Sequence, residues 1–114
     1  MIMPSKRVIA SAILALILTS PQVSSAEGRT GHTFTGWSEA VQDSFIDISV
    51  SMAGIVATQT KPEVARCIDE WYFSDTAIKA QRDDELRHTI QQNLDFHPGA
   101  VILASLIKAC GSFS

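Results

Sequence analysis

The amino-acid sequence predicts an all-α protein: a small four-helix domain with one disulfide, preceded by a cleaved signal peptide. Three observations predict this class. Apolar residues recur at intervals of three and four through most of the chain after residue 35, which is the period of an amphipathic helix. Residues that start or end helices (Ser, Thr, Asp, Pro and Gly) separate these periodic segments. The two cysteines fall on two different predicted helices, far apart in the sequence.

The N-terminus has the three-part layout of a secretory signal peptide. Lys6 and Arg7 precede the apolar run 8–19, and the small residues Ser24 and Ala26 stand at the −3 and −1 positions of a cleavage site. A short membrane anchor is the alternative, but a membrane-spanning helix needs about 20 apolar residues. We therefore expect residues 1–26 to be removed and the protein to be exported, to the periplasm or the medium, without stable membrane insertion.

Processing would leave 88 of the 114 residues, enough for one domain. All 12 acidic residues follow Ala26, whereas Lys6 and Arg7 leave with the signal peptide. Seven basic residues against 12 acidic ones give the mature chain a net charge of −5. This charge argues against nucleic acid and anionic membranes as partners and permits a basic protein.

The mature chain divides into a tail and a domain. Residues 27–35 contain two glycines, three threonines and no apolar run, so we expect a flexible N-terminal tail. Residues 36–114 form the single helical domain. Within it, the sequence predicts helices over 36–59, 61–73, 76–93 and 98–110.

The first predicted helix carries a long apolar stripe, which we expect to face the core. Its spacing is 4-4-3-4-3, and its members are Trp37, Val41, Phe45, Ile48, Met52 and Ile55. Ile46, Val50, Ala53 and Ala57 lie beside the stripe and widen the buried face. Glu39, Asp43 and Asp47 are four apart and fall on the opposite side, where we expect a solvated row rather than a cation site.

The second predicted helix begins with Thr60-Lys61-Pro62-Glu63, in which Thr60 and Glu63 can form a reciprocal capping box. Val64, Cys67, Ile68 and Trp71 then repeat at helical spacing on its apolar side. This spacing turns Cys67 toward the core, where we expect the last helix to lie.

The last predicted helix is apolar nearly all round, so we expect it at the centre of the domain. Pro98 suits its first turn, and Gly111 suits the position after its end. Cys110 and Cys67 permit one intramolecular disulfide, whose loop of about 43 residues would stabilise the fold by about 4 kcal/mol. Two free thiols, or a bridge between chains, are the alternatives.

An aromatic run marks the candidate binding patch. Trp71, Tyr72 and Phe73 are consecutive, and neighbours on a helix point about 100° apart, so they cannot all face one core. We expect one or two of them on the surface as a partner-binding patch. The acidic residues included in this patch are Asp69, Glu70 and Asp75. The alternative is a helix end enclosed from several sides.

Catalytic motifs are missing from the sequence. It contains no glycine-rich phosphate loop, GxSxG, HExxH or CxxC. Asp84 and His88 are one helical turn apart, and with His97 they are weak metal-ligand candidates. A solvated, salt-bridged helix explains Asp84 and His88 as well, and His97 can instead cap the last helix. We therefore expect no enzyme activity and no cofactor.

Three functions stay open at this point. The first is a non-catalytic protein that binds another protein in the cell envelope. The second is a stress chaperone, because the layout (small, exported and helical, with two distant cysteines) is similar to that of the acid-stress periplasmic chaperones of the HdeA type. The third is a small metal-binding or catalytic protein, which requires Asp84, His88 and His97 to converge.

Overall fold

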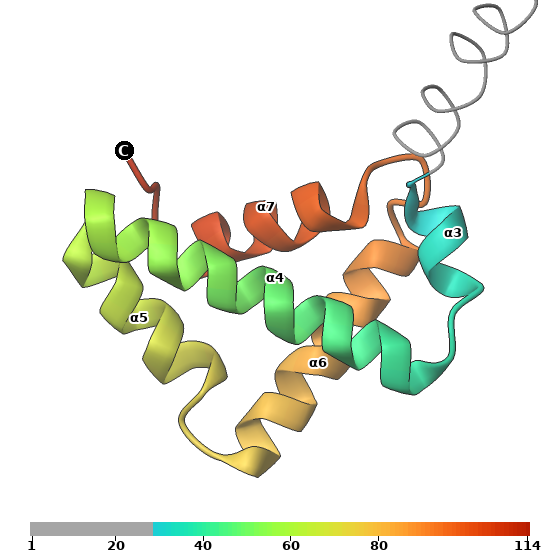
Figure 1. Ribbon diagram of the computed structural model, residues 1–114, viewed down its shortest axis with the longest axis horizontal. Coiled ribbons are helices and arrows are strands. Elements are labelled where there is room, and N and C mark those ends of the chain that lie inside the picture. Colours follow the sequence, from blue (N-terminus) through green and yellow to red (C-terminus); the bar gives the residue numbers. More distant parts are fainter. Residues whose placement is uncertain (1–28) are drawn as a thin grey trace, which may run out of the picture.

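The computed structural model describes residues 29–114; the predicted signal peptide, residues 1–26, lies outside this part of the chain. The described residues form five α-helices and no strand, so the all-α prediction is confirmed and the expected number of four helices is wrong. The helices are α3 (Gly31–Thr35), α4 (Glu39–Thr60), α5 (Pro62–Tyr72), α6 (Thr76–Gln91) and α7 (Pro98–Cys110) (Figure 1).

The longest helix, α4, crosses the whole domain and contacts α5, α6 and α7 (Figure 1). In Figure 1, α7 runs along the upper side of α4, while α5 and α6 form a V below it. Helix α7 also contacts α5 and α6, and the short α3 packs against α6. The core therefore lies between α4, the V and the inner side of α7.

The extra helix, α3, corrects the expectation of a flexible tail over residues 27–35. Residues 31–35 are helical, and Phe34 is completely buried against Trp37 and Phe45, with ring centroids 5.6 and 5.9 Å from its own. The Gly31 N–H donates to the carbonyl of Phe96 at 2.9 Å. A Cβ at Gly31 would lie 2.8 Å from the Cα of Leu94, so only glycine fits this close approach.

Helix boundaries are set by local capping residues, and one expected cap does not form. Ser38, Asp75 and His97 each accept a hydrogen bond at the start of a helix, and Gly111 has a positive φ of 97° after α7. The expected capping box of Thr60 and Glu63 is absent, because Thr60 is the last residue of α4. Its hydroxyl donates to the carbonyl of Val56 rather than capping α5.

The predicted buried face of α4 is confirmed for the residues beside the apolar stripe and wrong for most of the stripe itself. Ile46, Val50 and Ala57 are completely buried, whereas the expected core stripe is largely outside. Its exposed members and their exposed fractions are Val41 (49%), Ile48 (64%), Met52 (55%) and Ile55 (58%). Helix α4 has two apolar sides, and the acidic side chains decide between them.

Asp43 and Asp47, expected in solvent, point toward α6. Asp43 pairs with Arg87, and Asp47 pairs with Lys79 at 3.3 Å. These two ion pairs fix the rotation of α4 and turn Ile46 and Val50 inward.

Helix α7 is not enclosed on all sides, contrary to the sequence prediction. Val101, Ile102 and Leu106 are buried, but Leu103 and Ile107 remain 42% and 40% exposed. The neighbouring helices cover only part of α7, so one apolar side stays open.

Cys67 and Cys110 form the predicted intramolecular disulfide, with Cα atoms 5.7 Å apart. The bond ties the middle of α5 to the end of α7 across 43 residues of sequence. It therefore fixes α7 in place despite that helix's open side.

The burial of Phe34 predicts that α3 is an integral part of the domain. Replacing Phe34→Ala should lower the free energy of unfolding by about 3–5 kcal/mol, measured by urea denaturation, because a buried ring leaves a cavity. Phe96→Ala, at a ring that is 62% exposed, is the matched control and should change stability by less than about 0.5 kcal/mol. Equal effects of the two substitutions would show that α3 is not packed as described.

Candidate functional site

The three aromatic residues of the predicted patch differ in their exposure to solvent. Tyr72 is completely buried and Trp71 half-buried, while Phe73 is 39% exposed. Tyr72 is therefore unavailable to a partner, and its place in the predicted patch was wrong. Consecutive residues on a helix do diverge, as expected, but the domain encloses this helix end on the α6 side.

Trp71 and Tyr72 hold α5 against α6 instead. The Arg82 guanidinium lies over the Trp71 ring, 4.6 Å from its centroid, and its Nε–H donates to the Trp71 carbonyl at 2.9 Å. The Tyr72 hydroxyl donates to Asp83 at 2.5 Å. Both contacts tie α5 to α6.

The acidic members of the predicted patch are all exposed, and they differ in what they contact. Asp75 accepts a hydrogen bond from the Ile78 N–H at 2.8 Å and caps α6. Asp69 lines a hollow of about 360 Å³ together with Phe73 and Ile55. Glu70 is exposed on α5. Phe73 and Asp69 thus adjoin α4, and the role of this part of the patch stays a prediction.

A charged network surrounds the buried Tyr72 ring. The Lys79 ammonium lies 5.0 Å from the ring centroid, 3.3 Å from Asp47 and 3.5 Å from Asp83. Burial, followed by the hydrogen bond to Asp83 and the charge of that carboxylate, raises the pKa of Tyr72 well above its usual 10.0. The phenol therefore stays protonated at neutral pH and acts as a hydrogen-bond donor, not as a base.

The pKa of Lys79 is also raised. Burial alone would lower it, but the negative charges of Asp83 and Asp47 and their hydrogen bonds outweigh that effect. Lys79 therefore keeps its positive charge at neutral pH and joins α6 to α4 through its ion pair with Asp47.

A second polar network connects α3, α4 and α6. The buried Gln42 amide donates to the carbonyls of Phe34 and Trp37 at 3.0 and 3.2 Å, and its oxygen accepts from Arg87 at 2.9 Å. Arg87 also pairs with Asp43 and Asp84. These polar groups satisfy one another and join the three helices.

The three weak metal candidates are not brought together. Asp84 pairs with Arg87 at 2.7 Å, and His97 accepts a hydrogen bond from the Gly99 N–H at 2.9 Å. His88 is exposed on α6. Within residues 29–114 there is no group of three or more His, Cys, Asp or Glu side chains able to hold a metal ion.

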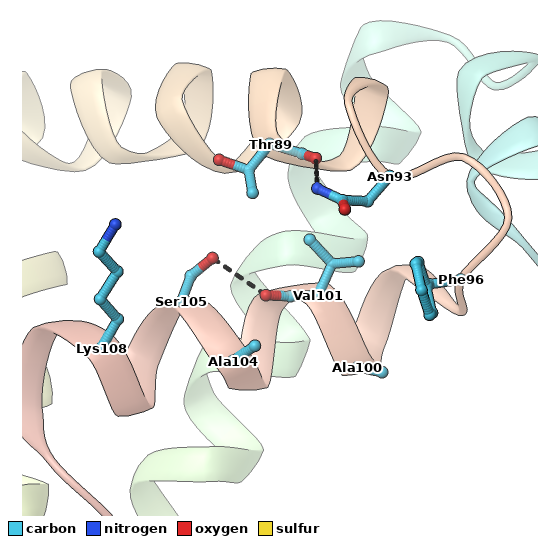
Figure 2. A pocket seen from close by; sticks show the side chains of 8 residues that line it. All are labelled: Thr89, Asn93, Phe96, Ala100, Val101, Ala104, Ser105 and Lys108. Carbon is cyan, nitrogen blue, oxygen red and sulfur yellow. Dashed lines mark hydrogen bonds between the residues drawn. The ribbon is translucent and has the colours of Figure 1, made fainter.

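A groove of about 350 Å³ runs between α6 and α7 (Figure 2). Val101 and Ala104 contribute apolar surface, with Phe96 at one end and Lys108 at the other (Figure 2). The polar atoms drawn there are already engaged: Ser105 donates to the Val101 carbonyl and Asn93 to that of Thr89 (Figure 2). The groove can accept an apolar chain, but few of its polar groups could orient one.

A larger apolar surface lies on the opposite side of α7 and on the outside of α4. We name it the outer apolar face. Its residues are Val41, Ile48, Met52, Ile55 and Val56 of α4 with Leu103 and Ile107 of α7, each 40–64% exposed. Met52, Val56 and Leu103 also line a hollow of about 300 Å³ between the two helices. The face is thus continuous from α4 to α7.

The outer apolar face carries almost no charge. The sequence contains no acidic or basic residue between Asp47 and Lys61. By length and composition alone, α4 is apolar enough to cross a membrane, although its Asp43 and Asp47 pair with cations of α6. Four of the seven residues, Val41, Ile48, Met52 and Ile55, belong to the apolar stripe that the sequence predicts to face the core.

The chain matches no protein-family model, no curated protein and no solved structure. No relative therefore assigns a role to any residue of this chain.

The environment of Tyr72 predicts a loss of stability in alkali. Above about pH 10 the unfolded chain releases the phenol proton while the folded protein keeps it, because the pKa of Tyr72 is raised on folding. The free energy of unfolding should then fall by about 1.4 kcal/mol per pH unit. Because Tyr72 is the only tyrosine, its absorbance at 295 nm during urea unfolding reports this ionisation directly.

Tyr72→Phe is the control for this titration. It removes the hydrogen bond to Asp83 and should cost about 1–2 kcal/mol at pH 7. The slope above pH 10 should become shallower, leaving the part due to Lys79, whose pKa is also raised on folding. An unchanged slope in Tyr72→Phe would show that the phenol is not protected as the structure indicates.

Proposed function

We propose that the protein is a non-catalytic binding module of the cell envelope and that the outer apolar face is its protein-binding surface. One observation carries this proposal: seven large apolar side chains are 40–64% exposed on one side of a small domain. The largest contiguous apolar patch on a monomer is often an interaction site.

The form of the surface favours a protein partner. Hollows of about 300 and 360 Å³ flank the exposed side of α4, one toward α7 and one toward α5. Such hollows receive individual side chains from a partner, as at the centre of protein interfaces. The near-absence of charge on this face disfavours nucleic acid, whose binding depends on cations.

A disulfide and two ion pairs hold the helices that carry the outer apolar face in place. The Cys67–Cys110 disulfide fixes α7, and ion pairs from Asp43 and Asp47 fix the rotation of α4. A surface held in its binding conformation loses less entropy when it binds. The predicted patch contributes at the edge, because Phe73 and Asp69 share a hollow with Ile55.

Two features favour a location in the cell envelope. The layout of residues 1–26 is that of a signal peptide, and a disulfide is stable in an oxidising compartment.

The proposal is tested with a photo-crosslinking residue in place of Ile55, in protein expressed from the full-length chain. Irradiation of the host's envelope fraction should join this position to a protein, and the adduct should disappear when Ile48→Glu is added. The same crosslinker in place of Phe96, which is equally exposed but lies outside the face, is the matched control. Equal labelling from both positions, or none from Ile55, would refute the proposal.

A further inference from the structure

The spacing of the apolar residues along the exposed side of α4 indicates which partner the outer apolar face binds. Val41, Phe45, Ile48, Met52 and Ile55 are separated by four, three, four and three residues, which is the a/d spacing of a coiled coil. We call these five residues the seam. In this structure no helix covers the seam, since four of its five side chains are about half exposed or more. Phe45 is half-buried at its edge.

We propose that a second copy of this chain covers the seam: two α4 helices pack antiparallel about a twofold axis at Ile48. The inference rests on the proposed function and names the partner of that face. A twofold interface uses the same patch on both copies, so the patch must be compatible with itself.

The flanks of the seam meet this requirement. Ser44, Ser51 and Thr58 line one flank of the helix, and Ser49 lies on the other. These short side chains allow two helices to approach closely. None of them is charged, so two copies of an acidic protein can meet here without repulsion between like charges.

The charges at the two ends of α4 favour the antiparallel arrangement. Glu39 lies at its N-terminal end and Lys61 follows its C-terminal end, whereas Asp43 is paired with Arg87 of the same copy. Parallel helices would bring the acidic ends of both copies together. Antiparallel helices separate these ends, place each near the partner's Lys61 and oppose the two helix dipoles.

The exposed area is sufficient for a weak but specific dimer. The seven side chains of the face present on the order of 600 Å² per copy, or roughly 1,200 Å² in total, the lower end of the range for stable interfaces. The hollows on either side of α4 could take up the partner's side chains and add to this area. The groove between α6 and α7 stays outside the interface.

Sedimentation equilibrium of protein expressed from the full-length chain tests the proposal. We expect a dimer at tens of micromolar. Ile48→Glu places two carboxylates at the twofold axis and should weaken self-association on the order of 100-fold. Phe96→Glu is the matched control, because Phe96 is 62% and Ile48 64% exposed, and it should leave the dimer unchanged. Circular dichroism checks that both variants are folded.

Cysteine crosslinking tests the orientation. In antiparallel helices, Val41→Cys of one copy meets Ile55→Cys of the other, so only a mixture of the two variants should crosslink. In parallel helices each variant crosslinks with itself, and that result would overturn the proposed arrangement.

A wild-type monomer at 100 μM, or a dimer that survives Ile48→Glu, would overturn self-pairing. If a monomer still crosslinks to a different envelope protein from Ile55, the proposed function stands and only the identity of the partner is wrong. A monomer that floats with phospholipid vesicles through this face would contradict both proposals.

Discussion

The fold depends on which side of α4 faces α6. This helix has two apolar sides, and hydrophobic burial alone does not choose between them. Asp43 and Asp47 make the choice, because they pair with Arg87 and Lys79 on α6. With the opposite rotation, both half-buried cations would lose these partners and keep only Asp84 and Asp83 of α6 itself, so the loss of the two ion pairs that join the helices is unfavourable. The inward position of Ile46 and Val50 is therefore an electrostatic result as much as a hydrophobic one.

The same constraint creates the outer apolar face. Once Ile46 and Val50 point inward, Ile48 and Ile55 must point outward, and the described domain has no further helix to cover them. Helix α7 adds Leu103 and Ile107 to this surface because the disulfide at its end holds it beside α4 and α5. A small acidic domain thus presents an uncharged surface, which is the basis for the binding function that we propose.

The sequence predicted the helices better than their faces. Pro98, Gly111 and the N-caps are local signals, so α7 was placed from Pro98 to Cys110, and the cysteine pairing followed from composition. The buried side of α4 could not be predicted from local signals, because two sets of apolar residues at helical spacing lie on this helix. One set forms the exposed stripe, and the other forms the core. The choice depends on Arg87 and Lys79, which are distant in sequence. Helix α3 was missed because one phenylalanine in a polar stretch, Phe34, gives no periodic signal.

The rotation of α4 is tested most directly by truncating two neighbouring isoleucines. Ile46→Ala and Ile48→Ala remove the same atoms from the same helix, two residues apart. Urea unfolding at two protein concentrations separates folding from self-association. We expect Ile46→Ala to lower the free energy of unfolding by about 2–5 kcal/mol and Ile48→Ala by less than about 0.5 kcal/mol in the dilute limit. The reverse order would mean that the heptad stripe is the core and that no outer apolar face exists.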